Sequence, residues 1–241
     1  YFQDSEPSRG YCLRDLWAPF ALVAPLILLT LLQPDLGTAI ILGLVFMSMV
    51  LMGGLRLKSF LGLALAGLAF LPMGWQLLRP YQRQRVLTFL DPDRDPLGAG
   101  YHVIQSQIAI GSGRLFGQGY LHGSQNRLDF LPAQHTDFIF AVFSEEWGFA
   151  GCFVLLACYF GLIVYCLKLF ERAKDRFGAL LVFGMVSIIF WHVVINTSMV
   201  MGLMPVVGVP LPLFSYGGSS LASMMFAVGV MINVSMRRYT F

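Results

Sequence analysis

The sequence predicts an all-α polytopic membrane protein, with six transmembrane helices and one long extracytoplasmic loop between the third and the fourth. Hydrophobic residues make up 57% of the 241 positions and charged residues only 12%, whereas about a quarter of the residues in soluble domains are charged. The mean hydropathy is +0.70. Apolar runs of membrane length, about 20 residues, recur along the whole chain. Residues 1–241 are therefore expected to form a single transmembrane domain.

Each expected helix is an apolar run that ends at polar or helix-breaking residues. Short links join most of the runs, at residues 34–35, 55–58 and 170–176. The fourth and fifth runs are longer than a bilayer requires, so we expect them to tilt or to project beyond it. The predicted spans are residues 17–33, 36–54, 59–78, 136–169, 177–204 and 213–236.

Residues 79–135 are polar and too long to be a simple connector in a compact bundle, so we expect them to carry function. A cytoplasmic N-terminus would place ten of the sixteen basic residues inside, as the positive-inside rule favours. The long loop then faces outward. The ten residues are Arg9, Arg14, Arg56, Lys58, Lys168, Arg172, Lys174, Arg176, Arg237 and Arg238.

The remaining composition excludes some classes of protein. A net charge of +3, with basic residues dispersed along the chain, does not indicate nucleic-acid binding and fits a membrane-surface bias. The cysteines show no metal-ligand spacing and are interpreted as packing residues. Because the chain begins at Tyr1 without a methionine, we expect it to be part of a longer protein.

The strongest local signal is the loop from Asp129 to Asp137, which runs directly into the fourth span. Thr136 is a plausible N-cap, which would place Asp137 in the first helical turn, where the helix dipole favours the ionised form. Such an aspartate is often no more than a helix-starting residue. Glu145 and Glu146, however, follow at membrane depth, where carboxylates usually face a cavity or a partner. We therefore predict a polar cavity that leads inward from Asp137.

Two other polar pairs allow two interpretations each. Arg83 and Arg85 follow the third span and could hold a phosphate, although arginines at this position commonly extend to lipid headgroups. His192 and Asn196 share one face of the fifth span. They are expected to form interhelical hydrogen bonds, with a proton path as the alternative.

Two glycine- or proline-rich segments complete the pattern. Residues 111–119 contain four glycines, but their spacing differs from a dinucleotide-binding loop and no βαβ pattern surrounds them. Residues 205–220 contain three prolines and cannot be helical throughout. Irregular backbone at membrane depth is tolerated only where protein or a water-filled cavity shields it. We expect this segment to line the same cavity as Asp137.

Six motifs recur in one order over nearly the whole chain. They are Gln33–Gly37, Tyr81–Val86, Asp95–His102, Asp129–Pro132, His135–Phe140 and Ser215–Ser220. In this order they resemble the SEDS family (shape, elongation, division and sporulation), the bacterial peptidoglycan glycosyltransferases of the RodA and FtsW type. The forms at residues 121–125 and 207–212 look more like the RodA-like, elongation branch than the division branch. The family has about ten transmembrane helices, of which this chain resembles the last six.

The resemblance implies polymerisation of lipid II into glycan strands at the outer face of the bacterial cytoplasmic membrane. Asp137 matches the family's essential aspartate and would be the general base that deprotonates the acceptor hydroxyl. A β-1,4 link formed from an α-linked pyrophosphate donor implies inversion, which needs no carboxylate nucleophile. Asp129 would support the base or, with Asp137, hold a divalent cation such as magnesium or manganese.

The resemblance also implies how the remaining residues act. Arg83 and Arg85 would neutralise the leaving undecaprenyl pyrophosphate. The expected substrate-binding residues are Arg83, Arg85, His135, Thr136, Ser215, Tyr216, Gly217, Gly218 and Ser219. The implied partners are a class B penicillin-binding protein, which is a transpeptidase, and the rest of the elongation machinery.

Two alternatives stay open at this point. A transporter that moves lipid-linked precursors would also have buried acids and broken helices, and a non-catalytic scaffold for a penicillin-binding protein would need no active site. A transporter should carry its charged pathway near the membrane midplane, whereas Asp137 is predicted at the outer rim. The enzyme is therefore the favoured interpretation.

Overall fold

A computed structural model describes residues 11–91, 98–123 and 135–237, and these residues form helices joined by turns and irregular segments, with no strand among them. The chain divides into two compact units. Unit 1 comprises residues 1–80, 166–188 and 230–241, and unit 2 comprises residues 81–165 and 189–229. The boundaries fall at the start of α4 (Pro80–Leu90) and within the three helices α7 (Ile139–Glu171), α8 (Arg176–Val200) and α9 (Gly218–Arg237).

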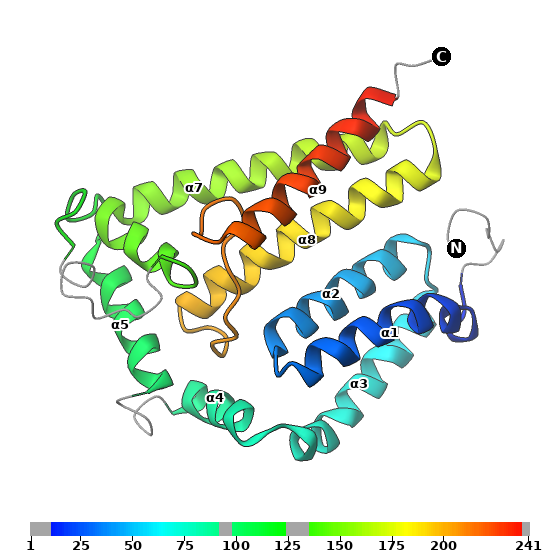
Figure 1. Ribbon diagram of the computed structural model, residues 1–241, viewed down its shortest axis with the longest axis horizontal. Coiled ribbons are helices and arrows are strands. Elements are labelled where there is room, and N and C mark those ends of the chain that lie inside the picture. The colour runs from blue at the N-terminus through cyan, green and yellow to red at the C-terminus, as the bar shows by residue number, and fades with distance from the viewer. Residues whose placement is uncertain (1–10, 92–97, 124–134, 238–241) are drawn as a thin grey trace. The chain divides into compact units, whose positions relative to one another are not determined.

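Unit 1 begins with a short 3₁₀ helix, η1 (Leu13–Leu16), and three helices, α1 (Trp17–Leu32), α2 (Leu36–Met52) and α3 (Leu57–Leu77). Figure 1 shows α1 and α2 side by side, joined by a tight turn. Asp35 caps α2, because its side chain accepts hydrogen bonds from the amide of Thr38 at 3.0 Å and from the hydroxyl of Thr38 at 2.6 Å. The capping aspartate therefore fixes where the second apolar run begins.

The six predicted spans correspond to α1, α2, α3, α7, α8 and α9. In the described part of the chain, α7, α8 and α9 are long and apolar enough to cross a membrane, whereas α1 and α2 are shorter apolar helices of 16 and 17 residues. Three predicted ends were wrong. α7 begins at Ile139 rather than 136, α8 ends at Val200 rather than 204, and α9 begins at Gly218 rather than 213. Before α7 and before α9 the backbone outside the helix bonds to other parts of unit 2, as described below. After α8 the amides of residues 201–203 bond back to carbonyls of α8.

The predicted long loop contains two helices, α4 (Pro80–Leu90) and α5 (Ala99–Ser112). α5 buries Val103, Ser106 and Ala109, which recur every three residues and so lie on one helix face. The Ser106 hydroxyl donates to the Val200 carbonyl at 2.9 Å, which ties α5 to the end of α8. The spacing of these buried residues is visible in the sequence. The polar residues of α5, however, keep it from being an apolar run of membrane length, so it was not predicted as a helix.

α7 is interrupted at Gly148, whose φ of 65° and ψ of −165° are not helical. Such a break leaves backbone amides and carbonyls without their helical partners. Residues 114–119 supply the replacements, so that a loop is inserted into the break. The four bonds are Gln118 N to Glu145 O at 2.9 Å, Gly119 N to Glu146 O at 3.1 Å, Phe149 N to Arg114 O at 2.9 Å and Ala150 N to Leu115 O at 3.0 Å.

The glycines of residues 111–119 make this insertion possible. A Cβ atom at Gly113 would collide with the carbonyl of Ser144, and one at Gly117 would collide with the carbonyl of Glu146. Gly117 also has a φ of 77°, in the left-handed region that favours glycine. The segment that superficially resembled a nucleotide loop therefore serves to complete the backbone of α7.

We predict that Gly117→Ala destabilises the fold. An alanine with positive φ costs more than about 1 kcal/mol, and the collision with the Glu146 carbonyl adds to this cost. Gly161→Ala is the matched control, because Gly161 lies in regular α7 helix with nothing within 4 Å of an added Cβ. Thermal unfolding in detergent should show a lower midpoint for Gly117→Ala and an equal or higher one for Gly161→Ala. Equal midpoints for Gly117→Ala and the unmodified protein would contradict the insertion.

Candidate active site

The candidate site lies in unit 2, at the turn of residues 135–138 that precedes α7. The Phe138 carbonyl accepts the first helical hydrogen bond, from the amide of Ala141 at 2.9 Å. Phe138 therefore occupies the N-cap position that the sequence assigned to Thr136, and Asp137 precedes the helix instead of lying in its first turn. The prediction of Thr136 as N-cap was wrong because the carbonyls before Phe138 are bound by donors from elsewhere.

Three consecutive carbonyls of this turn each accept a hydrogen bond from a distant part of the chain. The Tyr216 amide donates to His135 O at 2.8 Å, and the Ser215 hydroxyl donates to Thr136 O at 2.6 Å. The Asn196 side-chain amide donates to Asp137 O at 2.9 Å. The turn is thus held by α8 and by the segment that precedes α9. Asn196 was expected to bond to another helix; it bonds instead to irregular segments outside α8.

The segment of residues 201–217 is irregular, as its prolines predicted, and it is fixed by hydrogen bonds from the surrounding helices. The Tyr159 hydroxyl of α7 bonds to the Pro212 carbonyl at 2.5 Å. The Asn196 amide bonds to Val209 O at 2.6 Å, and Arg85 bonds to Val206 O at 3.1 Å. These donors satisfy carbonyls that a helix would otherwise pair, which is the condition for irregular backbone in a membrane protein.

The Asp137 carboxyl is partly buried, and burial raises its pKa above the ordinary value for aspartate. A hydrogen bond from the Thr136 side chain and the positive charge of Arg85 act in the opposite direction and lower the pKa. Gly208, with a φ of 74°, lies alongside, since a Cβ there would be 3.4 Å from Asp137 Oδ2. The net direction is upward, whereas the helix dipole at a first-turn position would have lowered this pKa.

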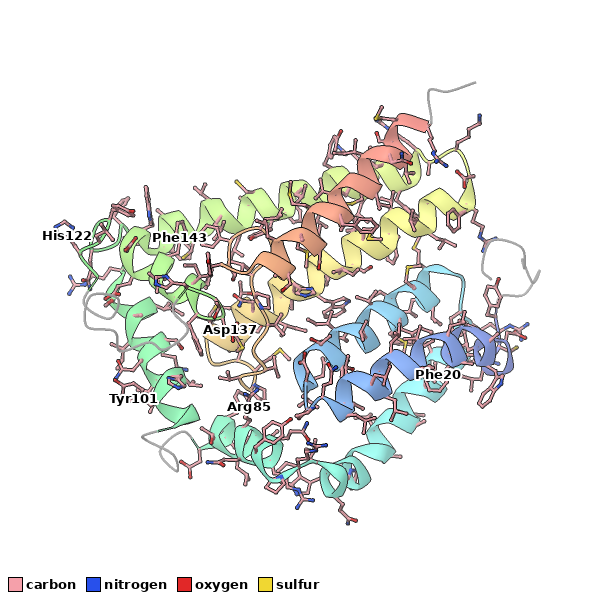
Figure 2. The ribbon with its side chains drawn as sticks, in the orientation of Figure 1. Phe20, Arg85, Tyr101, His122, Asp137 and Phe143 are labelled. Carbon is pink, nitrogen blue, oxygen red and sulfur yellow. The ribbon has the colours of Figure 1, made fainter. Side chains whose placement is uncertain are left out.

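Arg85 reaches the site from α4, and Figure 2 shows its side chain extending toward the 201–217 segment. Its guanidinium also lies 5.9 Å from the ring centroid of Tyr81, within cation–π range. Arg83 is two residues earlier, about 200° around the helix axis. The helix therefore presents Arg85 to Asp137 and directs Arg83 to a different face, so the two arginines do not act as a pair on this carboxyl.

A cavity of about 580 Å³ opens beside the turn. Its walls include five residues that the sequence assigned to substrate binding, namely His135, Ser215, Tyr216, Gly217 and Gly218. The apolar wall was not predicted, because apolar residues in such a chain look like ordinary membrane packing. Of the other assigned residues, Thr136 lies in the adjoining turn and Ser219 is exposed on α9. The remaining lining residues are Ile139, Leu213, Phe214 and Leu221.

The predicted cavity acids lie elsewhere in unit 2. Glu145 and Glu146 are buried at the break in α7, and Glu146 Oε1 accepts a hydrogen bond from the Leu121 amide at 3.2 Å. A Cβ at Gly123 would lie 2.5 Å from Glu145 Oε2, so this carboxylate is packed against the end of the inserted loop. Among the described residues, neither acid lines the cavity beside the turn of residues 135–138, and Asp137 is not among its lining residues either. Their position indicates a role in holding residues 117–123.

The predicted cation site involves Asp129, which lies outside the described residues. Within the described ranges, no three His, Cys, Asp or Glu side chains are grouped closely enough to hold a metal ion. Binding of magnesium or manganese by Asp129 and Asp137 therefore stays a prediction.

Comparison with known proteins gives concordant matches. The family model described as cell cycle protein, for FtsW, RodA and SpoVE, matches residues 1–240. Peptidoglycan glycosyltransferase MrdB of Escherichia coli strain K12 is 49% identical over 213 residues, which are 88% of this chain and 57% of that protein. This chain thus spans less than two thirds of the length of that relative.

Two solved structures share the fold. A chain from the structure titled "Structural coordination of polymerization and crosslinking by a peptidoglycan synthase complex" is 35% identical, with a TM-score of 0.78, over 98% of this chain and 66% of that one. The rod shape determining protein RodA of Thermus thermophilus is 27% identical, with a TM-score of 0.65, over 100% of this chain and 61% of that one.

We predict that Ser215→Ala lowers stability by about 1–3 kcal/mol, because it leaves the buried Leu211 amide and the Thr136 carbonyl without their hydrogen bonds. Ser219→Ala is the matched control, since Ser219 is exposed and lies four residues further along. Denaturation in detergent should separate the two variants. Equal stability of both would mean that the Ser215 hydroxyl does not hold the turn.

Proposed function

Because the chain belongs to the FtsW, RodA and SpoVE family of cell cycle proteins, we propose that the protein containing it is a peptidoglycan glycosyltransferase. It would polymerise lipid II into glycan strands for cell elongation and shape. The observation that carries the proposal is Asp137, a partly buried carboxyl with a raised pKa within electrostatic reach of Arg85, in a turn whose neighbouring residues His135 and Ile139 line a cavity.

In this proposal Asp137 is the general base. It removes the proton from the acceptor 4-hydroxyl of lipid II, and the resulting nucleophile attacks the anomeric carbon of the growing strand. The bond to undecaprenyl pyrophosphate breaks in the same step, with inversion of configuration. A carboxyl whose pKa is raised toward the working pH is a stronger base than an ordinary aspartate, which supports this role.

Arg85 would neutralise charge that develops on the leaving pyrophosphate. The cavity lined by His135 and residues 213–218 would receive the substrate, and its apolar wall suits a molecule that carries a lipid chain. Asp129 would support the base or, with Asp137, hold a magnesium or manganese ion. Arg83 lies on another face of α4, which leaves it a contact to a different part of the substrate or to lipid headgroups.

The proposal extends to the membrane arrangement and the partner. Six spans, with residues 79–135 on the outer face of the cytoplasmic membrane, would place Asp137 where exported lipid II is available. The three long apolar helices and the basic residues assigned to the inner side support this orientation. A class B penicillin-binding protein is the proposed partner, supported by the likeness to a chain of a peptidoglycan synthase complex.

The test is polymerisation of purified lipid II by the detergent-solubilised full-length protein together with its partner, with glycan strands separated on a gel. Detergent micelles have no two sides, so a transporter would leave lipid II unchanged. A non-catalytic scaffold would also give no strands with a partner whose own chemistry is only crosslinking. Strand formation therefore separates the proposed enzyme from both alternatives.

We predict that Asp137→Asn reduces the polymerisation rate by about two to four orders of magnitude, the usual cost of losing a general base. The substitution keeps the size of the side chain, and the Asp137 backbone carbonyl can still accept from Asn196. Elution as a single folded species on size exclusion is the control for folding. Near-normal strand formation by the folded variant would refute Asp137 as the base.

We predict that Arg85→Met moves the acidic limb of the pH–rate profile to higher pH. Asp137 must be deprotonated to act as a base, so the rate rises with pH through its pKa. The positive charge of Arg85 lowers this pKa, so removing the charge raises the pKa. The acidic limb of the profile therefore moves to higher pH. Arg85→Lys retains the charge and should leave the limb near its original position. A limb that stays fixed or moves downward in Arg85→Met would contradict this assignment.

A further inference from the structure

Asn196 of α8 is a fully buried polar side chain that connects two segments of the site. Its Nδ2 group donates to Asp137 O at 2.9 Å and to Val209 O at 2.6 Å. A side-chain amide has two N–H donors, so these two bonds use both of them. One buried amide thus joins the turn that carries Asp137 to the irregular segment that borders it.

The orientation of this amide follows from its surroundings. If the Asn196 side chain were reversed, Oδ1 would face two carbonyl oxygens, and both contacts would be repulsive. Val209 is itself buried, so water does not replace a lost bond at its carbonyl without entering the protein. The two carbonyls therefore require a side chain with two N–H donors, and the asparagine side chain on α8 is long enough to reach both.

The two hydrogen bonds of Asn196 help to fix the position of Asp137, the proposed base. The turn has no helical hydrogen bond at the Asp137 carbonyl to fix it, because the first helical hydrogen bond of α7 is accepted by the Phe138 carbonyl. Val209 directly follows Gly208, which lies alongside the Asp137 carboxylate. A displacement of about 1 Å in a reacting group can cost about 100-fold in rate. Asn196 consequently sets both the backbone position of Asp137 and the wall against which its carboxylate lies.

We propose that Asn196 is a positioning residue for Asp137: by donating to Asp137 O and Val209 O it holds the base in register with the segment that flanks it. This inference rests on the proposed function, in which Asp137 is the base. Asn196 has no part in the proton transfer itself. Its loss should therefore reduce kcat, while the substrate cavity, lined by other residues, keeps its affinity.

Asn196→Leu is the principal variant, since leucine has the same branching and number of side-chain heavy atoms and no donor. Thr197→Val is the matched control. Thr197 is the next residue and is also buried, but its hydroxyl bonds within α8, to Val193 O at 2.7 Å and Val194 O at 3.3 Å. Both variants lose buried hydrogen bonds, and only Asn196→Leu releases the turn. Asn196→Ser, which keeps one donor on a shorter side chain, is a second variant in case leucine prevents folding.

The experiment measures kcat and KM for lipid II with the full-length protein and its partner, for the folded fraction recovered by size exclusion. We expect kcat to fall about 10- to 100-fold in Asn196→Leu, with KM within about twofold of the original value. Thr197→Val should keep kcat within about twofold. Asn196→Ser should give an intermediate kcat.

Several outcomes overturn the proposal. An unchanged kcat in folded Asn196→Leu, or a raised KM with unchanged kcat, removes the positioning role. Equal losses of kcat in Asn196→Leu and Thr197→Val, or failure of both Asn196 variants to fold, leaves the residue structural only. An original protein that forms no strands, or an active Asp137→Asn, instead refutes the proposed function, so the two failures are distinguishable.

Discussion

Every backbone amide and carbonyl shielded from water needs a partner within the protein, and this constraint shapes unit 2 wherever a helix is interrupted. At Gly148 the partners come from residues 114–119. Before α7 and between α8 and α9 they come from side chains, such as Asn196, Ser215 and Tyr159. The breaks are costly only when their polar groups stay unpaired. Here each break is completed by a specific contact, and those contacts fix the positions of the segments around the candidate site.

The same contacts explain why the candidate base lies outside a helix. In a regular helix the Asp137 carbonyl would be bound by an amide four residues later, and its side chain would follow the helix surface. Instead the carbonyls of residues 135–137 are bound by three donors from 59 to 81 positions further along the chain. The turn is thereby coupled to the 201–217 segment. Its position depends on tertiary structure, and a change in that segment is transmitted to Asp137 through defined bonds.

The sequence predicted the apolar helices α1, α2, α3, α7, α8 and α9 because long apolar runs are a strong signal, and its motifs singled out His135 and residues 215–218, which line the cavity. It did not predict the break at Gly148, where apolar residues continue on both sides and the backbone angle of one glycine decides the geometry. It also missed α4 and α5, whose polar content resembles a loop. The sequence could not predict the hydrogen bonds of Asn196, because their acceptors are carbonyls of irregular segments. The positions of those carbonyls depend on the path of the backbone. The joint assignment of Arg83 and Arg85 to the leaving pyrophosphate stays a prediction, and the 100° rotation per residue places the two arginines on different faces of α4.

The electrostatics of the site give the proposed reaction an order of events. Burial raises the pKa of Asp137, and Arg85 offsets part of that rise. If Arg85 binds the pyrophosphate as proposed, the phosphate charge offsets the charge of Arg85, and its influence on Asp137 weakens. The pKa of Asp137 then rises further, so that the carboxylate is a stronger base when the donor is in place than when the site is empty. Donor binding would in this way prepare the base for the acceptor. The coupling requires Arg85 and Asp137 to stay near each other, and the hydrogen bonds of Asn196 and Ser215 to the turn and of Arg85 to Val206 O hold both residues in place.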